Sequence, residues 1–346
     1  MIGSPRVGRL VPLAAVLLGL AVPYLLRSYF VSLLALVFIA ALLAASVDML
    51  AGQMHLVSVG HAGIAASAAY AVGWSANQGY GYPTQLTLAA LVTILVSAVY
   101  AVTSMRTSGI FFLMMTVALG MVVFGLAYRL SSVTGGENGL RGIRRPAMFA
   151  QTWQLYYLTL TALVLVLIAL WVIQGSPFGL VLRGIRDSES RMSSLGYSVP
   201  AYKFSAIMIS GLVAGMAGLL AVWHAEFVSP SSAGFLKSAL TVIMVILGGV
   251  GRPLGPLVGA AIVIWTENVL STHVERWPTV LGLIFIVVVL FAPEGIVGSI
   301  RDFGKRRRIL RTPRHRARGG SSGAQTGADA AASSTTLSMP SQATSS

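Results

Sequence analysis

Ser58 and His61 come nearest in this chain to a catalytic pair. Three residues apart, they would share one face of a helix, where a histidine can act as a base toward a serine hydroxyl. No third group that would orient the histidine can be assigned, and His55 stands six residues before His61, which is not a same-face ligand spacing. We therefore predict no catalytic and no metal-binding residues. Ser58 and His61 are interpreted as structural residues or as the lining of a pathway.

The chain also lacks a sequence that would bind the phosphates of ATP. A P-loop needs Gly-x4-Gly-Lys-Ser/Thr. The nearest run, Gly298 to Arg306, has five intervening residues and no hydroxyl after its lysine. There are no cysteines, which excludes thiolate metal sites and a cysteine nucleophile. We expect this chain to bind no cofactor, so any drive from ATP must come from a partner.

Composition places these residues in a membrane. Of 346 residues, 55% are hydrophobic and 10% are charged, against about 25% charged in soluble domains. The apolar runs are continuous rather than alternating, which indicates helices and not strands. We expect an all-α integral membrane protein, a polytopic bundle of about ten transmembrane helices. The expected spans are about 10–26, 30–50, 57–75, 84–104, 109–129, 155–174, 202–223, 237–250, 254–270 and 280–298.

The spans 237–250 and 254–270 are short for a hydrocarbon core of roughly 30 Å. They flank Leu247 to Pro256, a run rich in glycine and proline. Such residues break helices, and broken helices at membrane depth persist only where protein or water covers them. We therefore predict broken helices within the bundle.

Five glycines recur at four-residue spacing, which puts each set on one helix face. Small residues there let two backbones approach closely. They are expected to be helix-packing positions, either within this chain or at a seam with a second membrane subunit. The two sets are Gly211 and Gly215, then Gly251, Gly255 and Gly259.

Charge along the chain predicts its orientation. Residues 301–318 hold nine Lys and Arg directly after the last span, and such a run marks a cytoplasmic face that meets anionic lipid. An even number of spans puts both termini on that side, together with 17 of the 24 Lys and Arg. The net charge of +14 therefore indicates membrane lipid and not nucleic acid as the partner.

Four segments follow from this orientation. Residues 1–9 would be a cytoplasmic N-terminus and residues 10–300 the transmembrane domain. Residues 301–318 would be a basic juxtamembrane segment. Residues 319–346, mostly Ser, Ala, Gly and Thr, have no apolar face and are predicted to be a disordered tail.

Two polar segments interrupt the spans. Within the loop 175–201, residues 179–197 carry both charge signs and an apolar side, and Gly196 occupies the position expected of a helix-ending glycine. This predicts a short amphipathic helix on the cytoplasmic surface, with a solvated loop as the alternative. The other segment is glycine-rich and predicted outside, and is either a ligand gate or a flexible turn. It contains Thr134, Gly135, Gly136, Glu137 and Asn138, and is followed by Arg141, Arg144 and Arg145, which could meet an acidic partner.

Three blocks of sequence together resemble the branched-chain amino acid ABC permease family, of the LivM type. The first runs from Gly179 to Ser198 and continues with Tyr202 to Phe204 and with Ser210 to Leu219. The second is Thr134 to Leu140. The third comprises Leu247 to Ala260 with Phe291 to Ile296. The resemblance extends from about residue 30 to 300.

The resemblance implies a division of labour in a bacterial inner membrane. An extracytoplasmic solute-binding protein would deliver leucine, isoleucine or valine to this chain and a LivH-type permease subunit. Two LivG/LivF-type ATPases would use ATP and grip the amphipathic segment as a coupling helix. The expected contacts are Arg183, Arg186, Glu189, Arg191, Leu195 and Gly196.

Two alternatives stay open. The same importer architecture could carry urea, amides or another small solute. An ion-coupled secondary carrier would need paired ionisable groups within the membrane. Asp48, Glu226 and Glu267 all stand near the edges of expected spans, which weakens the carrier hypothesis.

Overall fold

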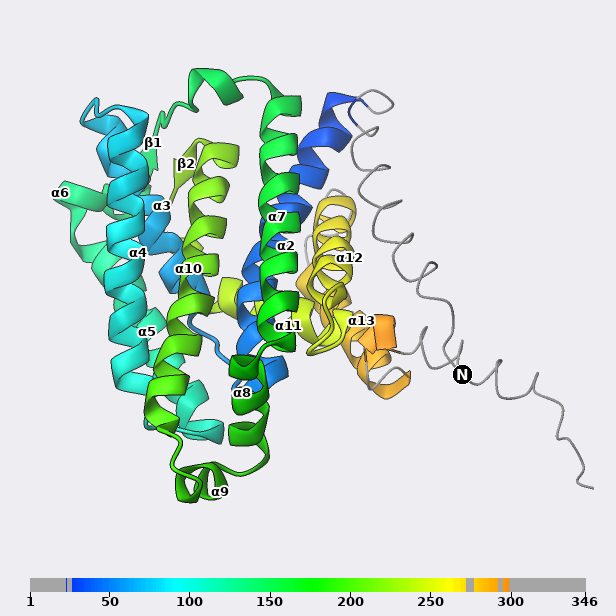
Figure 1. Ribbon diagram of the computed structural model, residues 1–346. Coiled ribbons are helices and arrows are strands. Elements are labelled where there is room, and N and C mark those ends of the chain that lie inside the picture. The colour runs from blue at the N-terminus through cyan, green and yellow to red at the C-terminus, as the bar shows by residue number, and fades with distance from the viewer. Residues whose placement is uncertain (1–22, 24–26, 272–276, 292–294, 299–346) are drawn as a thin grey trace, which may run out of the picture. The chain divides into compact units, whose positions relative to one another are not determined.

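The computed structural model describes residues 23, 27–271, 277–291 and 295–298, which all belong to one compact unit, residues 1–305 (Figure 1). Most of the described residues are helical. The long helices are α2 (Ser28–Met54), α3 (His61–Asn77), α4 (Tyr82–Ser104), α5 (Gly109–Arg129), α7 (Thr152–Gly175) and α10 (Val199–Ala225). The shorter ones are α6 (Ser131–Thr134), α8 (Pro177–Asp187), α9 (Glu189–Ser194), α11 (Phe235–Gly248), α12 (Gly255–Leu270) and α13 (Trp277–Phe291). Four predicted segments lie outside the described residues: 1–9, most of span 10–26, 301–318 and 319–346.

The helices confirm a membrane protein with several spans. By length and composition, five described helices could each cross a membrane: α2, α4, α5, α7 and α10. Large apolar side chains such as Leu95, Phe111 and Trp171 are exposed on the outer faces of three of them, as lipid contact requires. The short helices α11 and α12 occupy the expected spans 237–250 and 254–270. The total of about ten spans remains a prediction.

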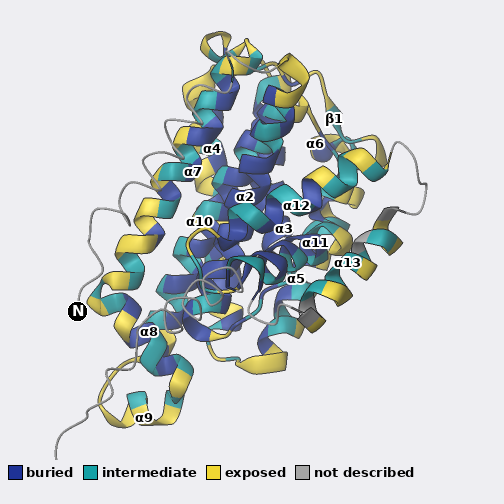
Figure 2. Cartoon of the chain, turned by 90° about the vertical axis from the view of Figure 1, so that its right-hand side faces the viewer, coloured by how far each residue is buried: buried dark blue, intermediate teal, exposed yellow. Residues whose placement is uncertain are grey.

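Helix α2 is the central helix of this part of the chain. It packs against α7, α8, α10, α11 and α12, and buried residues surround it in Figure 2. A helix that is apolar on every side is stable only when other helices cover it, and α2 has almost no polar face. The sequence of α2 therefore accounts for its position.

The chain is not helical between α2 and α3. Span 57–75 was expected to hold Ser58 and His61 on one helix face, but α3 begins at His61, so Ser58 lies in the preceding turn-like segment. Neighbouring helices satisfy the backbone that this break frees. The Val59 N–H donates to Thr116 Oγ1 (3.2 Å), and the Tyr100 hydroxyl donates to the Gly60 carbonyl (3.1 Å). The prediction that Ser58 and His61 share a helix face was wrong, because tertiary contacts replace the helical hydrogen bonds at Val59 and Gly60.

The predicted interruption between α11 and α12 is present. Residues 249–254 connect the two helices, and Gly249 and Gly251 have φ of 109° and 74°, which only glycine adopts without strain. The backbone of Gly251 lies directly against Gly52 of α2, where no side chain would fit. The broken helix is thus held by the central helix.

Short elements gather at two opposite ends of the helices (Figure 1). One end carries α8 and α9. The other carries α6, η1 (Gly136–Asn138), η2 (Ala147–Phe149) and the strands β1 (Leu140–Arg141) and β2 (Phe227–Val228). The strands pair antiparallel, with Leu140 opposite Val228. A further turn, η3 (Pro230–Ala233), leads to α11. The loops predicted on opposite sides of the membrane therefore lie at opposite ends.

The four-residue glycine sets pack within this chain, but the shared helix face expected for Gly251, Gly255 and Gly259 was wrong, because Gly251 lies in the connection before α12 with φ +74°. Gly211 and Gly215 of α10 face Ser97 and Thr93 of α4, and Gly259 of α12 lies against the backbone of α11. Gly255 lies against the end of α11 at Gly248 and Gly249. Close contact of this kind drives helix association in lipid, where water offers no hydrophobic force.

We expect Gly259→Ala to destabilise the protein by about 1–3 kcal/mol, because the new methyl group would overlap the Met244 carbonyl. Gly125→Ala is the matched control, since Gly125 is also within a helix but faces open space. Thermal unfolding of both variants in detergent measures the difference. Equal midpoints for the two variants would contradict the packing described.

Candidate functional site

The charged segment folds into two helices rather than the one expected. Helix α8 ends at Asp187 and α9 begins at Glu189, and Ser188 between them is extended, with φ −168° and ψ 106°. The Ser188 hydroxyl accepts a hydrogen bond from the Arg191 N–H (3.3 Å), as an N-cap residue does. The single-helix expectation was wrong because this serine starts a second helix. Residues 177–196, the two helices and the turn that closes α9, thus form a helical hairpin, called here the α8–α9 hairpin.

Gly196 ends α9 as the sequence predicts. Its φ is +88°, and its N–H donates to the Ser193 carbonyl (3.0 Å). The Tyr197 N–H donates to the Met192 carbonyl (3.1 Å). These two bonds form a Schellman motif, in which glycine takes the left-handed position. The turn fixes the direction in which the chain leaves the hairpin toward α10.

Two of the predicted coupling residues attach the hairpin to the rest of the chain. Arg183 donates through Nη1 to Gln53 Oε1 (3.2 Å) and to the Gln174 carbonyl (2.7 Å), so it joins α8 to α2 and α7. Glu189 pairs with Lys203 at 2.5 Å. The base of the hairpin is therefore fixed by ionised groups.

Lys203 is buried, with its side chain 2% exposed. Its ammonium also donates to the Thr107 carbonyl in the turn between α4 and α5 (3.0 Å). A buried ammonium needs such partners, because leaving it unpaired costs several kcal/mol. Glu189, Lys203 and Thr107 thus join α9, α10 and the α4–α5 turn. The sequence places Lys203 in a motif at the cytoplasmic side but assigns it no contact, since nothing at its position in an apolar helix distinguishes it from a snorkelling lysine.

The tip of the hairpin faces outward. Arg191 and Gly196 are exposed, and the Leu195 side chain is 66% exposed. Arg186 pairs with its neighbour Asp187 at 3.1 Å. The predicted coupling residues therefore fall into two sets: Arg183 and Glu189 contact this chain, while the others lie on or near the surface.

His61 belongs to a chain of hydrogen bonds across three elements. Its Nδ1 is 2.7 Å from Ser58 Oγ and its Nε2 is 2.6 Å from Ser210 Oγ. The Ser210 hydroxyl donates to the Ser46 carbonyl at 2.6 Å. Because Ser210 uses its proton on Ser46, Nε2 must donate, and Nδ1 then accepts from Ser58. Both ring nitrogens are therefore engaged within the protein.

This chain of bonds does not form a hydrolytic site. Ser58 is 1% exposed and His61 is 2% exposed, so a substrate cannot reach the hydroxyl. The polar groups instead tie α3 to α10 and α2 where the α2–α3 break frees the backbone. Among the described residues, no group of three or more His, Asp and Glu could hold a metal.

The glycine-rich loop is a compact folded turn. The Thr134 hydroxyl donates to the carbonyls of Ala127 (2.6 Å) and Leu130 (2.8 Å) and accepts from the Gly136 N–H (3.3 Å). Gly135 and Gly136 have φ of 73° and 60°. Such internal bonding makes the loop a fixed turn rather than a flexible one, and its role as a gate stays a prediction. Only Glu137 and Asn138 at its tip are exposed, and Glu137 accepts from the Tyr128 hydroxyl (3.3 Å).

Comparison with known proteins decides the family. The family described as "Branched-chain amino acid transport system / permease component" matches residues 29–292. The chain belongs to this family. It is similar to the high-affinity branched-chain amino acid transport system permease protein LivM of Salmonella typhimurium and of Escherichia coli K12. With each it is 26% identical over 327 residues, which cover 86% of this chain and 77% of the relative.

A third relative is the probable branched-chain amino acid transport permease protein LivH of Methanocaldococcus jannaschii. It is 26% identical over 159 residues, or 43% of this chain and 49% of the relative. No solved structure matches the chain. All three relatives are named as permeases.

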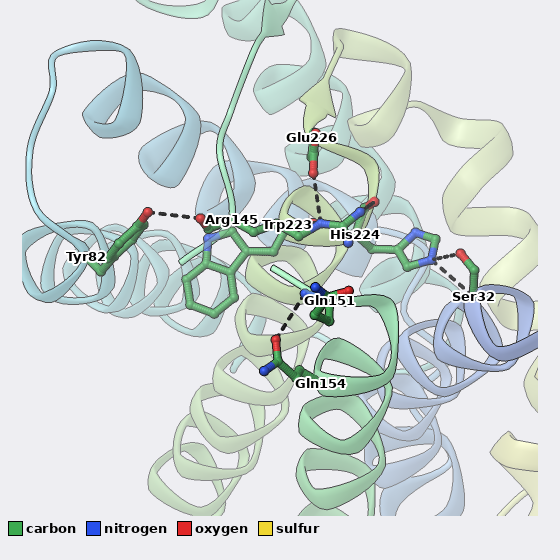
Figure 3. Close-up of polar contacts among 8 residues, drawn as sticks. All are labelled: Ser32, Tyr82, Arg145, Gln151, Gln154, Trp223, His224 and Glu226. Atoms are coloured by element: carbon green, nitrogen blue, oxygen red, sulfur yellow. Dashed lines mark hydrogen bonds and ion pairs between the residues drawn. The ribbon is translucent and has the colours of Figure 1, made fainter. Parts of the chain in front are cut away.

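In this permease, Arg145 is not available to an acidic partner as expected. Its guanidinium donates to the carbonyls of Trp223 (2.7 Å) and His224 (3.0 Å) and pairs with Glu226 (2.9 Å), which caps the C-terminal end of α10 (Figure 3). The Tyr82 hydroxyl donates to the Arg145 carbonyl (2.9 Å). Arg145 binds here because the unpaired carbonyls at a helix end attract a nearby cation.

Three further contacts lie at the same end of the permease. His224 Nε2 lies 3.2 Å from Ser32 Oγ on α2, and the Gln151 N–H donates to Gln154 Oε1 (3.0 Å) where α7 begins (Figure 3). Arg141 lies over the ring of Phe227, 5.6 Å from its centroid. Arg141 and Arg144 are both exposed, but Arg141 contacts the Phe227 ring, so Arg144 is the better candidate for a partner.

A hollow of about 340 Å³ lies between α2 and α12. Its lining is almost wholly apolar, so it offers little to the carboxylate and ammonium of an amino acid. The lining residues are Phe30, Leu33, Leu34, Val37, Ala261 and Trp265.

We expect Ser210→Ala to lower the free energy of unfolding by about 1–3 kcal/mol, because it leaves His61 Nε2 without its partner in a buried place and removes the bond from the Ser210 hydroxyl to the Ser46 carbonyl. Ser205→Ala is the control, since that hydroxyl bonds only to Ala201 of its own helix. Thermal unfolding in detergent is the measurement. Indistinguishable stability of the two variants would count against the hydrogen-bond chain.

Proposed function

We propose that this chain is the transmembrane permease subunit of an ATP-binding-cassette importer for leucine, isoleucine and valine. The observation that carries the proposal is similarity to LivM along 86% of the chain, since that relative is named for high-affinity branched-chain amino acid transport. The helices that could cross a membrane suit a translocation path. The chain has no P-loop of its own, so ATP would be used by separate subunits.

The α8–α9 hairpin suits a coupling element. Its base is held by Arg183 and Glu189, whereas Arg191 and Leu195 at its tip are exposed. A rigid base and an exposed tip let an ATPase push the hairpin without unfolding it. Two LivG/LivF-type ATPases are the proposed partners.

Further partners complete the assembly. A LivH-type permease subunit would pair with this chain, and a solute-binding protein would deliver cargo at the end that carries β1 and β2. In this proposal both termini are cytoplasmic and the chain lies in the bacterial inner membrane, in contact with anionic lipid. Glu137, Asn138 and Arg144 are exposed at the proposed receiving end.

A second cargo class is urea, amides or another small solute carried by the same architecture. Uptake of labelled leucine into cells lacking the gene, with and without its restoration, separates the cargoes. We expect restored uptake that isoleucine and valine compete away and urea does not. Restoration of urea uptake alone would overturn the proposal that branched-chain amino acids are the cargo. A complete lack of ATP-dependent uptake would overturn the proposal that the chain belongs to an importer.

We expect the double variant Arg191→Ala with Leu195→Ala to reduce leucine uptake by about tenfold or more, because truncating interface anchors typically costs over 1 kcal/mol each. Leu180→Ala is the matched control, since its side chain is also 66% exposed but lies on α8, away from the tip. Immunoblotting of membranes checks that both proteins accumulate equally. Normal uptake by the double variant would refute the docking role of the tip.

A further inference from the structure

Helix α2 carries a carboxylate in the middle of the bundle. Asp48 is 4% exposed and stands six residues before α2 ends at Met54. Its Oδ1 accepts a hydrogen bond from the Gly251 N–H at 2.6 Å. Carboxylates inside membrane helices are expensive and are usually retained for function. Packing alone would not select an aspartate here.

The partner of Asp48 is the connection between α11 and α12. Gly251 has φ +74°, and its backbone lies against Gly52, one turn beyond Asp48 on the same face of α2. The carboxylate and the close glycine contact together fix this connection to α2. When the C-terminal part of α2 moves, residues 249–254 therefore move with it.

Gln53, which follows Gly52 on α2, contacts the α8–α9 hairpin. Gln53 is 4% exposed, and its Oε1 accepts from Arg183 of α8 at 3.2 Å. Arg183 holds α7 as well, through the Gln174 carbonyl. From Asp48 to Gln53 the helix rises only about 7.5 Å. One short, rigid piece of α2 thus contacts both the hairpin and the α11–α12 connection.

We propose that Asp48 and Gln53 are positioning residues that couple movement of the α8–α9 hairpin to the α11–α12 connection through α2. The inference rests on the proposed function, because it assigns the route by which an ATPase would act on the broken helix. Coupling between distant sites is carried by packed side chains and rigid elements of this kind. At Asp48 we assign the coupling role to the hydrogen bond and not to the charge, because the partner is a neutral N–H.

Two pairs of substitutions test the route in the full complex with its partner subunits in proteoliposomes. Asp48→Leu and Gln53→Leu remove the acceptor oxygens, whereas Asp48→Asn and Gln53→Glu keep them. We expect the leucine variants to transport about tenfold less labelled leucine per ATP hydrolysed, within the range that mutations along such networks produce. ATP hydrolysis itself should persist, and the conservative variants should transport as the unaltered complex does.

A buried control separates coupling from general damage. Ser75→Ala removes a fully buried hydroxyl that bonds only within α3, away from this route. We expect it to leave the ratio of transport to hydrolysis unchanged. If Asp48→Leu fails to assemble, Gln53→Leu tests the same route at the other contact.

Spin labels supply a readout that a purely structural role would not change. The chain has no cysteines, so Ser190→Cys on α9 and Leu254→Cys before α12 can be labelled as a pair. Gln151→Cys at the opposite end serves as the reference for each. On adding ATP, we expect both distances to the reference to change while the distance from 190 to 254 stays constant. In the Asp48→Leu background that distance should change.

Three results would overturn the inference. Unchanged coupling in both leucine variants would remove the route. Independent movement of positions 190 and 254 in the otherwise unaltered protein would do the same. Loss of transport in Asp48→Asn would show that the charge or proton of Asp48 is used, as in an ion-coupled carrier. Absence of ATP-driven uptake by the unaltered complex is a different failure, which removes the proposed function itself.

Discussion

The demand that backbone polar groups find partners away from water governs this structure. Helices satisfy that demand by themselves, but this chain interrupts its helices after Met54 and again at Gly248. At the first break Tyr100 and Thr116 supply the missing hydrogen bonds, and at the second Asp48 does. These polar groups therefore serve the backbone where the helices stop, because unsatisfied groups would otherwise face hydrocarbon.

Both breaks adjoin α2, since the first follows its end at Met54 and the second packs against Gly52. That helix is apolar on all sides, and its neighbours cover most of it. Glycines permit the close approach, since Gly52 meets Gly251 backbone to backbone. A helix buried this completely cannot move without moving the elements packed on it, because protein interiors are close-packed and transmit displacement. The position of α2 thus links packing to the proposed conformational change of the permease.

The two ends of the bundle use their charges differently. At one end Arg145 binds the last carbonyls of α10 and pairs with Glu226, so its charge stabilises the fold. At the other end Lys203 and Arg183 hold the base of the α8–α9 hairpin and leave its tip exposed. Basic residues that look alike in the sequence therefore have different roles: some stabilise contacts within the chain, and others stay exposed for partners.

The sequence by itself determined the membrane class, the helix positions, the interruption between residues 248 and 255, the helix-ending role of Gly196 and the family. These depend on local hydropathy, local spacing and ordered motifs. Only the tertiary structure decided that Ser188 divides the charged segment, that Ser58 lies outside α3, that Arg145 caps α10, and that Asp48 holds Gly251. The last two contacts join residues 78 and 203 positions apart. Helical periodicity reports which face a residue occupies within its own element. It carries no information on which distant backbone group will meet that face.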